Sequence, residues 1–441
     1  MVLSRIRLEN LRCVRAVDLD LAPLTILYGE NGAGKSSVIE GLQLLKQSAN
    51  QRINLHGSEY RGEEAVTTGL DFGEYHDVVL NNDEENWITL EIETRPTISE
   101  RQELDEAIKH IQRLPTFTIP QNLLKTVNHL GLSVSFRERE IKQSILVNSE
   151  ILETVEYARV SPMSNPTSRI TYPEVLVGKP RMQGGDDFLS PEGFLAQSDQ
   201  KEVGALCELS MCIVRIFQTR LQNTYLLSAS RGDISRSHQG GRKPSWVGIR
   251  GEQIVGLLTL IFSLSRSRYV EIADKIKLWA RTFQIKELHA GWIGDAWLKA
   301  SFMDPKLPNA RPNLADAGRG SRQVLSIITQ IFFSESGSTI LIEEPEASLH
   351  FGLIIDLMKL FGEAIKENKQ IIITTHSPAI PSMLKRCVKS KILEVKDVAI
   401  YELQKEKEGS TAKRLPITKE GIVKGFIPSI AKAEKMLLEE Y

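Results

Sequence analysis

The order of apolar and polar residues predicts an α/β protein that begins with an antiparallel pair of strands. Residues 2–8 alternate between apolar and charged side chains, and residues 16–21 form a second segment of strand character. The unbroken apolar run 24–28 then predicts a fully buried strand. Apolar residues recur at helical spacing between positions 38 and 45, so we expect a helix that packs back on a sheet.

The rest of the chain predicts further strands and helices on both sides of residue 200. No segment keeps a heptad pattern for three or four heptads, so no long coiled-coil arm is expected. Strands are expected at 78–80, 87–93, 225–228, 339–342 and 370–374, a β-meander at 132–137, 145–148 and 157–160, and hairpins at 288–293 with 297–303 and at 397–403 with 413–416. Helices are expected at 99–113, 202–221, 252–264, 272–282, 324–333 and 428–440, with a polar linker at 48–68 and a loop at 161–187.

The turn between the first buried strand and the first helix has the spacing of a phosphate-binding loop. Gly29 and Gly34-Lys35-Ser36 fit the pattern G-x-x-x-x-G-K-[ST]. Glycines let backbone N–H groups wrap a polyphosphate, and the helix N-terminus adds partial positive charge. Lys35 would reach the β- and γ-phosphates, and the Ser36 hydroxyl would bind Mg²⁺. A merely structural glycine turn would lack the strand and the helix that flank this match.

Composition narrows the class of protein. The 441 residues are 41% hydrophobic and 25% charged, as in ordinary globular proteins. Four scattered cysteines without a C-x-x-C pair favour reduced thiols over a disulfide framework or a zinc site. No apolar run of about 18 residues and no signal peptide is present, so we expect a cytoplasmic protein without a membrane partner.

One stretch, residues 231–250, is strongly basic although the net charge of the chain is only −1. A nucleic-acid site would have to be a local patch of this kind. Three interpretations stay open: a nucleic-acid site, a solvated surface loop and a docking loop for an acidic protein. The charged residues of the stretch are Arg231, Asp233, Arg236, Arg242, Lys243 and Arg250.

Two buried strands in the second half of the chain end in residues that suit phosphate chemistry. The strand at 339–342 runs into Glu343 and Glu344, where the first carboxylate could hold Mg²⁺ and the second could orient or deprotonate water. The strand at 370–374 runs toward His376, at the strand end where open α/β sheets bind ligands. Taken alone, the acidic pair is also compatible with a surface turn, and a lone histidine is more often a capping or hydrogen-bonded structural residue than a catalytic one. Together with the P-loop they predict one site, with the P-loop strand and the acidic strand as neighbours.

A glycine turn at 316–323 precedes the apolar helix at 324–333 and makes a second candidate anion site. The joint order of these motifs resembles the ATP-binding-cassette (ABC) class of ATPase heads, which includes the SMC proteins. It is most similar to the OLD-like (overcoming lysogenization defect) group of AAA ATPases. In this resemblance 316–323 is the signature loop, 343–346 the Walker B motif, 348–350 the D-loop and 71–77 the Q-loop region, within residues 1–384.

The resemblance implies a P-loop NTPase fold of the ABC/SMC-head type, with a mixed central sheet, an antiparallel β-subdomain and helical insertions. The expected domains are 1–96 (first half of the head), 97–222 (meander and helical insertion), 223–310 (core strand, basic loop and helices) and 311–441 (second half of the head). Only 65 residues follow His376, too few for the Toprim nuclease domain of OLD nucleases, so any nuclease would be another chain.

The resemblance also implies MgATP bound between two heads, with ATP binding closing a homodimer or higher oligomer and hydrolysis releasing it. Lys35, Glu344 and His376 are the expected catalytic residues, with His376 sensing the γ-phosphate, and Ser36 and Glu343 the expected Mg²⁺ ligands. The sequence lacks the usual signature string and a clear Q-loop glutamine, which leaves Gly320 and Ser321 as candidates in trans. The expected nucleotide-binding residues are Arg12, Asn31, Gly32, Ala33, Gly34, Lys35, Ser36, Ser37, Gly318, Gly320 and Ser321.

Three biological roles are compatible with such an ATPase. The first is the sensor or scaffold subunit of an anti-phage defence system that controls a separate effector, such as a nuclease or toxin. The second is a DNA-repair or DNA-end-binding ATPase that acts like a small SMC head, with DNA as a partner. The third is an ATP-gated scaffold whose slow hydrolysis is only a timer. The absence of coiled-coil arms counts against the second role.

Overall fold

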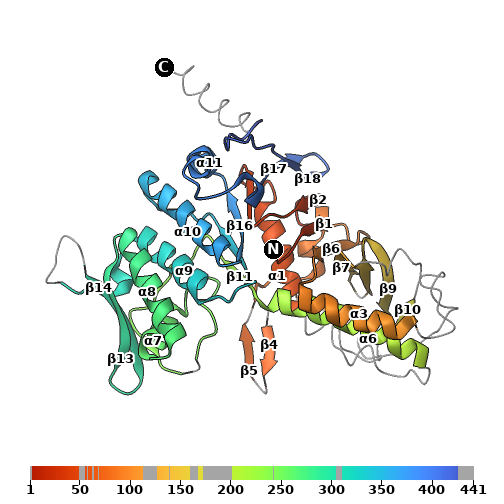
Figure 1. Cartoon of the computed structure of the whole chain (residues 1–441), viewed down its shortest axis with the longest axis horizontal. Helices are drawn as coiled ribbons and strands as arrows, with labels where there is room; N and C mark the ends of the chain where they lie inside the picture. The colour runs from red at the N-terminus through yellow and green to blue at the C-terminus, as the bar shows by residue number, and fades with distance from the viewer. Residues whose placement is uncertain are drawn as a thin grey trace. The chain divides into compact units, whose positions relative to one another are not determined.

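The structure is a computed structural model that describes residues 2–48, 55–56, 58–61, 64–67, 69–112, 127–138, 140–158, 167–171, 201–241, 243–303 and 310–425. Its chain forms two compact units, whose elements are labelled in Figure 1. Unit 1 comprises Met1–Leu21, Gly32–Thr224 and Leu403–Ala412, and unit 2 comprises Ala22–Asn31, Tyr225–Glu402 and Lys413–Tyr441.

Unit 1 is built on strands that alternate between buried and exposed residues. Strands β1 and β2 form the expected antiparallel pair, and β7 to β9 form the expected meander. The strand order is β10-β9-β8-β7-β6-β1-β2-β18. The bounds are β1 Arg5–Leu11, β2 Val14–Asp20, β6 Ile88–Thr94, β7 Leu130–Arg137, β8 Glu140–Val147, β9 Glu150–Ala158, β10 Thr167–Thr171 and β18 Gly409–Arg414.

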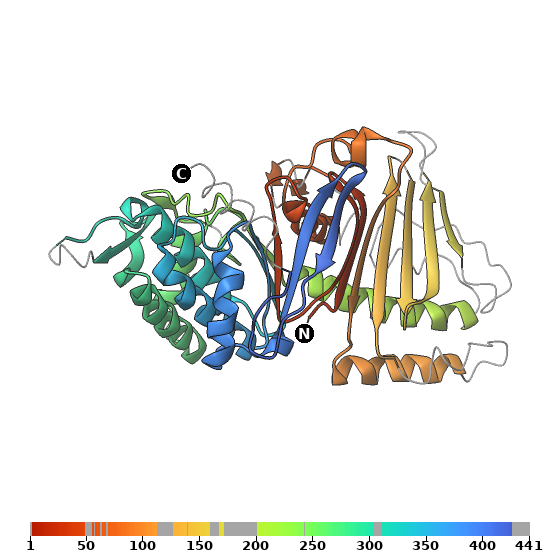
Figure 2. The ribbon, with the colours of Figure 1, turned by 90° about the horizontal axis from the view of Figure 1, so that it is seen from above.

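Three long helices lie in the described part of unit 1. Helix α1 (Lys35–Ser48) follows the P-loop, and α3 (Ile98–Gln112) and α6 (Lys201–Gln222) pack on each other. Figure 2 shows α6 running across the strands of the meander, where it contacts β7 and β8. Apolar residues of β7 at alternate positions, such as Leu132 and Val134, are fully buried there. Helix α6, with 22 residues, is the longest helix in the described part of the chain, as expected for a head without coiled-coil arms.

Three expectations for unit 1 were wrong in detail. Residues 78–80 are not a strand: Val78 ends the short helix α2 (Tyr75–Val78), Val79 forms an isolated β-bridge with Leu11, and Leu80 begins the 3-10 turn η1 (Leu80–Asn82). The capping of α2 at Glu74 and two left-handed asparagines, Asn81 and Asn82, favour turns over a strand. The expected linker holds a small hairpin, β4 (Ser58–Arg61) and β5 (Glu64–Thr67), and the expected loop holds β10. The remainder of that loop lies outside the described residues.

Unit 2 contains the parallel part of the sheet. Its strand order is β17-β3-β16-β15-β11, in which β3, β16 and β15 pair in parallel. These three strands are buried along almost their whole length, as expected for strands covered on both faces. The bounds are β3 Leu24–Gly29, β11 Thr224–Leu227, β15 Thr339–Glu343, β16 Gln370–Thr375 and β17 Val398–Glu406, the last of which continues into unit 1.

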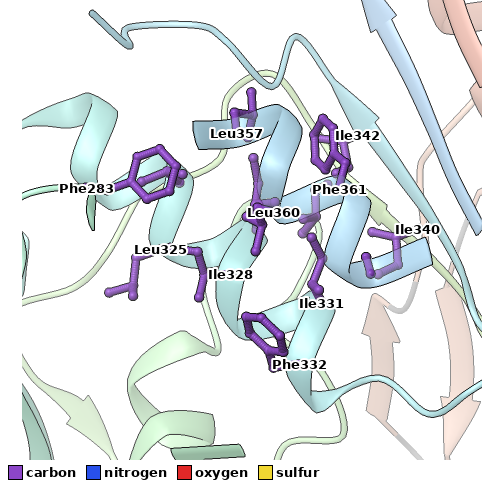
Figure 3. Close-up of a cluster of buried hydrophobic side chains, with 14 of the residues drawn as sticks. Phe283, Leu325, Ile328, Ile331, Phe332, Ile340, Ile342, Leu357, Leu360 and Phe361 are labelled. Carbon is purple, nitrogen blue, oxygen red and sulfur yellow. The ribbon is translucent and has the colours of Figure 1, made fainter. Parts of the chain in front are cut away.

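The helices of unit 2 close its hydrophobic core. In Figure 3, apolar side chains of α9, α10 and β15 gather around Ile328, Leu360 and Phe361, all fully buried. A small sheet of order β12-β14-β13 contacts α7. The bounds are α7 Ile254–Ser263, α8 Ser267–Thr282, α9 Arg319–Phe333, α10 Ile354–Lys366, α11 Ala379–Lys389, β12 His238–Gln239, β13 Lys286–Ile293, β14 Trp297–Met303, η2 Leu314–Asp316, η3 Phe351–Leu353 and η4 Val395–Asp397.

The elements expected in this half of the chain are therefore present, within a few residues of the predicted bounds. The hairpin at the end of the described chain is longer than predicted, because β17 extends to Glu406 and β18 starts at Gly409. The helix expected at 428–440 lies outside the described residues.

Candidate nucleotide site

The P-loop connects β3 in unit 2 to α1 in unit 1. Strand β3 ends at Gly29 and α1 begins at Lys35, so the first N–H groups of the helix follow directly on the turn. Gly34 has a φ of 91°, and a Cβ on it would lie 3.0 Å from Cγ2 of Val14. Only glycine fits this position without strain, which is why the turn can run so close to β2. Asn31, Gly32 and Ala33 form the turn itself.

The first turn of α1 is packed rather than solvated. Lys35 is 7% exposed and Ser37 is 5% exposed, and the Ser37 hydroxyl lies 3.8 Å from the Cys13 sulfur. Ser36, in contrast, is exposed. The loop therefore presents Ser36 outward and buries its neighbours, as expected if the Ser36 hydroxyl is a ligand.

Arg12 lies in unit 1 beside α1. Its backbone is left-handed (φ 54°), and its guanidinium lies 2.7 Å from Glu40 of α1 and 5.4 Å from the ring centre of Phe72. The ion pair and the cation–π contact hold the side chain against the helix. The structure thus brings Arg12 and the expected Q-loop region to the same helix that carries the P-loop residues.

In unit 2 the carboxyl ends of three parallel strands come level with one another. Thr375 of β16 pairs with Tyr28 of β3, and Glu343 of β15 pairs with Thr374 of β16. The start of the P-loop, the acidic pair and His376 therefore leave the sheet at one edge. The expectation that the P-loop strand and the acidic strand are neighbours was wrong, because β16, the strand that leads to His376, lies between them.

The acidic pair has two different environments. Glu343 accepts a hydrogen bond from the Ala229 N–H through Oε2 at 3.1 Å. Glu344 has a left-handed backbone (φ 43°), and its Oε1 lies 3.0 Å from Nδ1 of His376. The side chains of Glu344 and His376 are 31% and 51% exposed, so water can reach this carboxylate–imidazole pair. Such a pair can hold or accept a proton.

A third carboxylate of the motif, that of Glu346, is buried. It accepts a hydrogen bond from the Thr375 hydroxyl, and the Ser377 N–H in turn donates to Thr375 Oγ1 at 2.9 Å. Burial raises the pKa of Glu346, and the bond from Thr375 offsets part of that rise. These bonds fix both residues that flank His376. The sequence motif contained Glu346 but gave no sign of this function.

Arg231 is the functional candidate that sequence reasoning placed wrongly. Instead of lying in a solvated or docking loop, its side chain is 1% exposed. Its guanidinium donates to the carbonyl oxygens of Ser228, Glu343 and Glu344. Burial lowers its pKa to about 10, and the charges of Glu346, Glu343 and Glu344 work against that shift, so it stays protonated at neutral pH.

The remaining basic residues of that stretch have ordinary surroundings. Arg236 forms a two-bond ion pair with Asp316 of the expected signature loop, while Lys243 and Arg250 are exposed. Arg242 lies outside the described residues. Both ends of the stretch are tied together, because the Gly232 N–H donates to the Arg250 carbonyl oxygen at 2.8 Å. The sequence could not indicate these partners, which lie far along the chain.

The expected signature turn opens helix α9 in unit 2. Gly318 is the N-cap, and Gly320 and Ser321 lie in the first turn, partly exposed. A Cβ on Gly320 would lie 2.2 Å from the carbonyl oxygen of Ser348, so the signature turn packs directly on the expected D-loop. The next helical turn reaches back to the Arg231 segment, since Gln323 Nε2 donates to the Ala229 carbonyl oxygen at 3.3 Å.

The donor set fits a magnesium nucleotide. Mg²⁺ prefers hard oxygen ligands and keeps several waters when it binds one or two protein groups together with phosphates. The Ser36 hydroxyl and the Glu343 carboxylate are ligands of this kind. In the described part of the chain, no three His, Cys, Asp or Glu side chains are grouped so that they could hold a metal ion by themselves. No described helix is long and apolar enough to span a bilayer.

A buried parallel sheet with a glycine turn between strand and helix is the fold of a P-loop ATPase. Residues 1–179 and 268–380, more than half of the chain, match the model of the family described as AAA ATPase domain. The protein belongs to this family. The expected class of protein is thereby confirmed at the level of an AAA ATPase domain.

Three further comparisons concern individual proteins. The chain is 41% identical to the OLD nuclease of Thermus scotoductus over 44 residues, 10% of this chain and 8% of that protein. It is 39% identical to the DNA replication and repair protein RecF of Corynebacterium jeikeium over 66 residues, 14% of this chain and 16% of that protein. The SMC head bound to the C-winged helix domain of ScpA superposes with a TM-score of 0.49, at 11% identity, over 95% of this chain and 99% of that one.

Proposed function

We propose that this ATPase binds MgATP at its P-loop and hydrolyses it with the acidic turn that follows β15. The single observation that carries the proposal is the level register of β3, β16 and β15. In an open α/β sheet the carboxyl ends of such strands are where ligands bind. The chain leaves β3 there as the P-loop, and the carboxylates and the histidine leave the other two strands.

Each residue then has a distinct role. Lys35 and the amides of residues 31–34 hold the phosphates, and Ser36 and Glu343 hold the metal ion. When bound, Mg²⁺ neutralises charge that develops on the phosphate oxygens. Glu344 accepts a proton from the attacking water, and His376 orients the Glu344 carboxylate and senses the γ-phosphate. The water exposure of the Glu344–His376 pair supports this assignment.

We extend the proposal to a homodimer or higher oligomer in which the signature turn of one copy meets the nucleotide of another. Gly318, Gly320 and Ser321 would supply the start of α9 as the anion-binding surface. ATP would then shift the population from open to closed pairs, because it binds the closed form better.

The test of this mechanism is Glu344→Gln. The variant should bind ATP as the wild type does, lose nearly all turnover and stay in a nucleotide-dependent oligomer. ATP affinity, phosphate release and light scattering measure the three effects. Glu363→Gln, an exposed change on α10, serves as the matched control and should keep wild-type turnover. Equal turnover in Glu344→Gln would refute the assignment of the base.

At the level of biology, we propose the sensor or scaffold ATPase of an anti-phage defence system that controls a separate effector such as a Toprim-type nuclease. The resemblance to the OLD-like group and the match to an OLD nuclease support this role. The match to the DNA replication and repair protein RecF favours the alternative, a DNA-repair or DNA-end-binding ATPase. Both rest on family analogy.

Purification together with the products of neighbouring genes distinguishes the two roles. A co-eluting nuclease or toxin favours defence. DNA binding by the chain alone that depends on ATP and weakens steeply with salt favours repair, because the salt dependence reports phosphate contacts. A chain that hydrolyses ATP slowly and engages neither partner would fit the scaffold role.

A further inference from the structure

The turn after β11 makes an unusual set of contacts with the Walker B turn. In residues 228–231 the Ala229 N–H binds the Glu343 carboxylate, and the Arg231 guanidinium binds main-chain oxygens. The turn itself is held in place, because the Ser228 N–H donates to the Ile249 carbonyl oxygen at 2.9 Å. One short segment thus touches both carboxylate-bearing residues of the site.

The two carbonyl groups bound by Arg231 belong to successive peptide groups of the Walker B turn. The oxygens of Glu343 and Glu344 mark the two peptide planes on either side of the Glu344 Cα. Nη1 binds the first and Nη2 the second, the latter at 2.9 Å. The angle between two successive peptide planes is fixed by φ and ψ of the residue between them. A planar, rigid guanidinium that bonds to both planes therefore restrains φ and ψ of Glu344.

Glu344 needs such a restraint because its backbone is left-handed, at φ 43°. A residue with a Cβ disfavours this region, and such conformations persist only where the surroundings impose them. The backbone conformation sets the direction of the Cα–Cβ bond, and that direction brings the carboxylate to His376 Nδ1 at 3.0 Å. Relaxation of φ to negative values would turn the side chain away.

We propose that Arg231 is a positioning residue for the ATPase: its guanidinium, bonded to both carbonyl groups that flank Cα of Glu344, holds Glu344 in the left-handed conformation that aims its carboxylate at His376. This inference rests on the proposed role of Glu344. It assigns a function to a buried residue that acts through the main chain of Glu344 and lies more than a hundred positions earlier in the chain.

The experiment compares Arg231→Lys with Arg231→Met and with the control Arg268→Met, which removes a cation from an exposed ion pair with Glu335. Lysine keeps the charge but lacks the planar two-nitrogen fork. We expect Arg231→Lys and Arg231→Met to lower kcat about 10- to 100-fold, the effect of a misaligned catalytic group, with ATP affinity within about threefold of wild type. Arg268→Met should keep wild-type kcat.

Hydrogen exchange gives a readout that does not depend on hydrolysis. The Ala347 N–H donates to the Glu344 carbonyl oxygen at 3.0 Å, so its protection reports the conformation of the turn. In Arg231→Lys the exchange of residues 343–349 should rise while the core of α9 and α10 keeps its protection. If Arg231→Met does not fold, kcat and hydrogen exchange of Arg231→Lys alone test the positioning role.

Two outcomes would overturn the inference: wild-type kcat in Arg231→Lys, or unchanged protection of residues 343–349. Failure of the proposed function has a different signature. In that case Glu344→Gln would also hydrolyse ATP at the wild-type rate, whatever the Arg231 variants do. An inactive Glu344→Gln beside a fully active Arg231→Lys would remove only the positioning role.

Discussion

The phosphate-binding turn after β3 and the acidic turn after β15 both contain left-handed backbone, but they place it on different residue types. Both follow a buried parallel strand and both need left-handed backbone. The P-loop places that conformation on glycines, with φ 76° at Gly32 and 91° at Gly34. The acidic turn places it on Glu344, at φ 43°. Glycine adopts this region at little cost, whereas a residue with a Cβ pays about 1–2 kcal/mol.

The difference shows which residues stabilise the conformation of each turn. The P-loop needs no distant partner for its left-handed backbone, because glycines occupy the left-handed positions. The acidic turn depends on partners far along the chain: Arg231 binds its carbonyl groups, and the Glu344 N–H donates to the Thr374 carbonyl oxygen at 2.9 Å. We therefore expect changes in the first turn to act on nucleotide binding, and changes in the second to act on turnover and on stability.

The largest effect on nucleotide binding is expected from Lys35→Ala. A charge-assisted hydrogen bond contributes about 1.5–3 kcal/mol, so ATP affinity should fall about 10- to 100-fold, with little change in thermal stability. Titration with a fluorescent ATP analogue measures it. Lys366→Ala on α10, which removes an equal charge elsewhere, is the control. Unchanged affinity in Lys35→Ala would count against the P-loop assignment.

A smaller loss is expected from Gly34→Val. Valine at this φ is strained by about 1–3 kcal/mol, and its Cβ would also press on Cγ2 of Val14, only 3.0 Å away. ATP affinity should fall about tenfold. Gly32→Ala is the matched comparison, because no atom lies within 4 Å of its Cβ position and only the backbone preference is lost. Equal effects of the two changes would mean that close packing on β2 is unimportant.

The same contrast explains what could be predicted from the sequence. The P-loop, the buried strands and the acidic strand end were predicted because glycine spacing and apolar runs are local signals. The burial of Arg231, its bonds to the acidic turn and the bond from Thr375 to Glu346 were not, because they join residues separated by 29 to 113 positions. Residues 78–80 were wrongly assigned to a strand because apolar composition does not reveal capping by side chains.

The acidic turn itself can be tested with Glu344→Gly and Glu344→Ala. Both remove the carboxylate and should abolish turnover equally. Only glycine relieves the backbone, so Glu344→Gly should be more stable than Glu344→Ala by about 1 kcal/mol. Urea unfolding of the two variants measures the difference. If alanine proved as stable as glycine, the left-handed backbone at position 344 would carry no strain, and the comparison of the two turns would lose its basis.

The smallest effect concerns Glu346, the buried carboxylate of the same turn. Burial raises its pKa in the folded protein above the ordinary value of 4.5, so the folded state binds more protons than the unfolded state just above that pH. The free energy of unfolding therefore contains a contribution that falls as pH rises through this window.

Glu346→Gln resembles the protonated side chain and does not titrate, so its stability relative to wild type should increase with pH. Unfolding midpoints at several pH values from 4.5 upward measure the trend. Thr375→Val, which removes the bond that lowers the pKa of Glu346, should extend the fall in stability to higher pH. Parallel profiles for all three proteins would mean that the pKa of Glu346 is not raised in the folded protein.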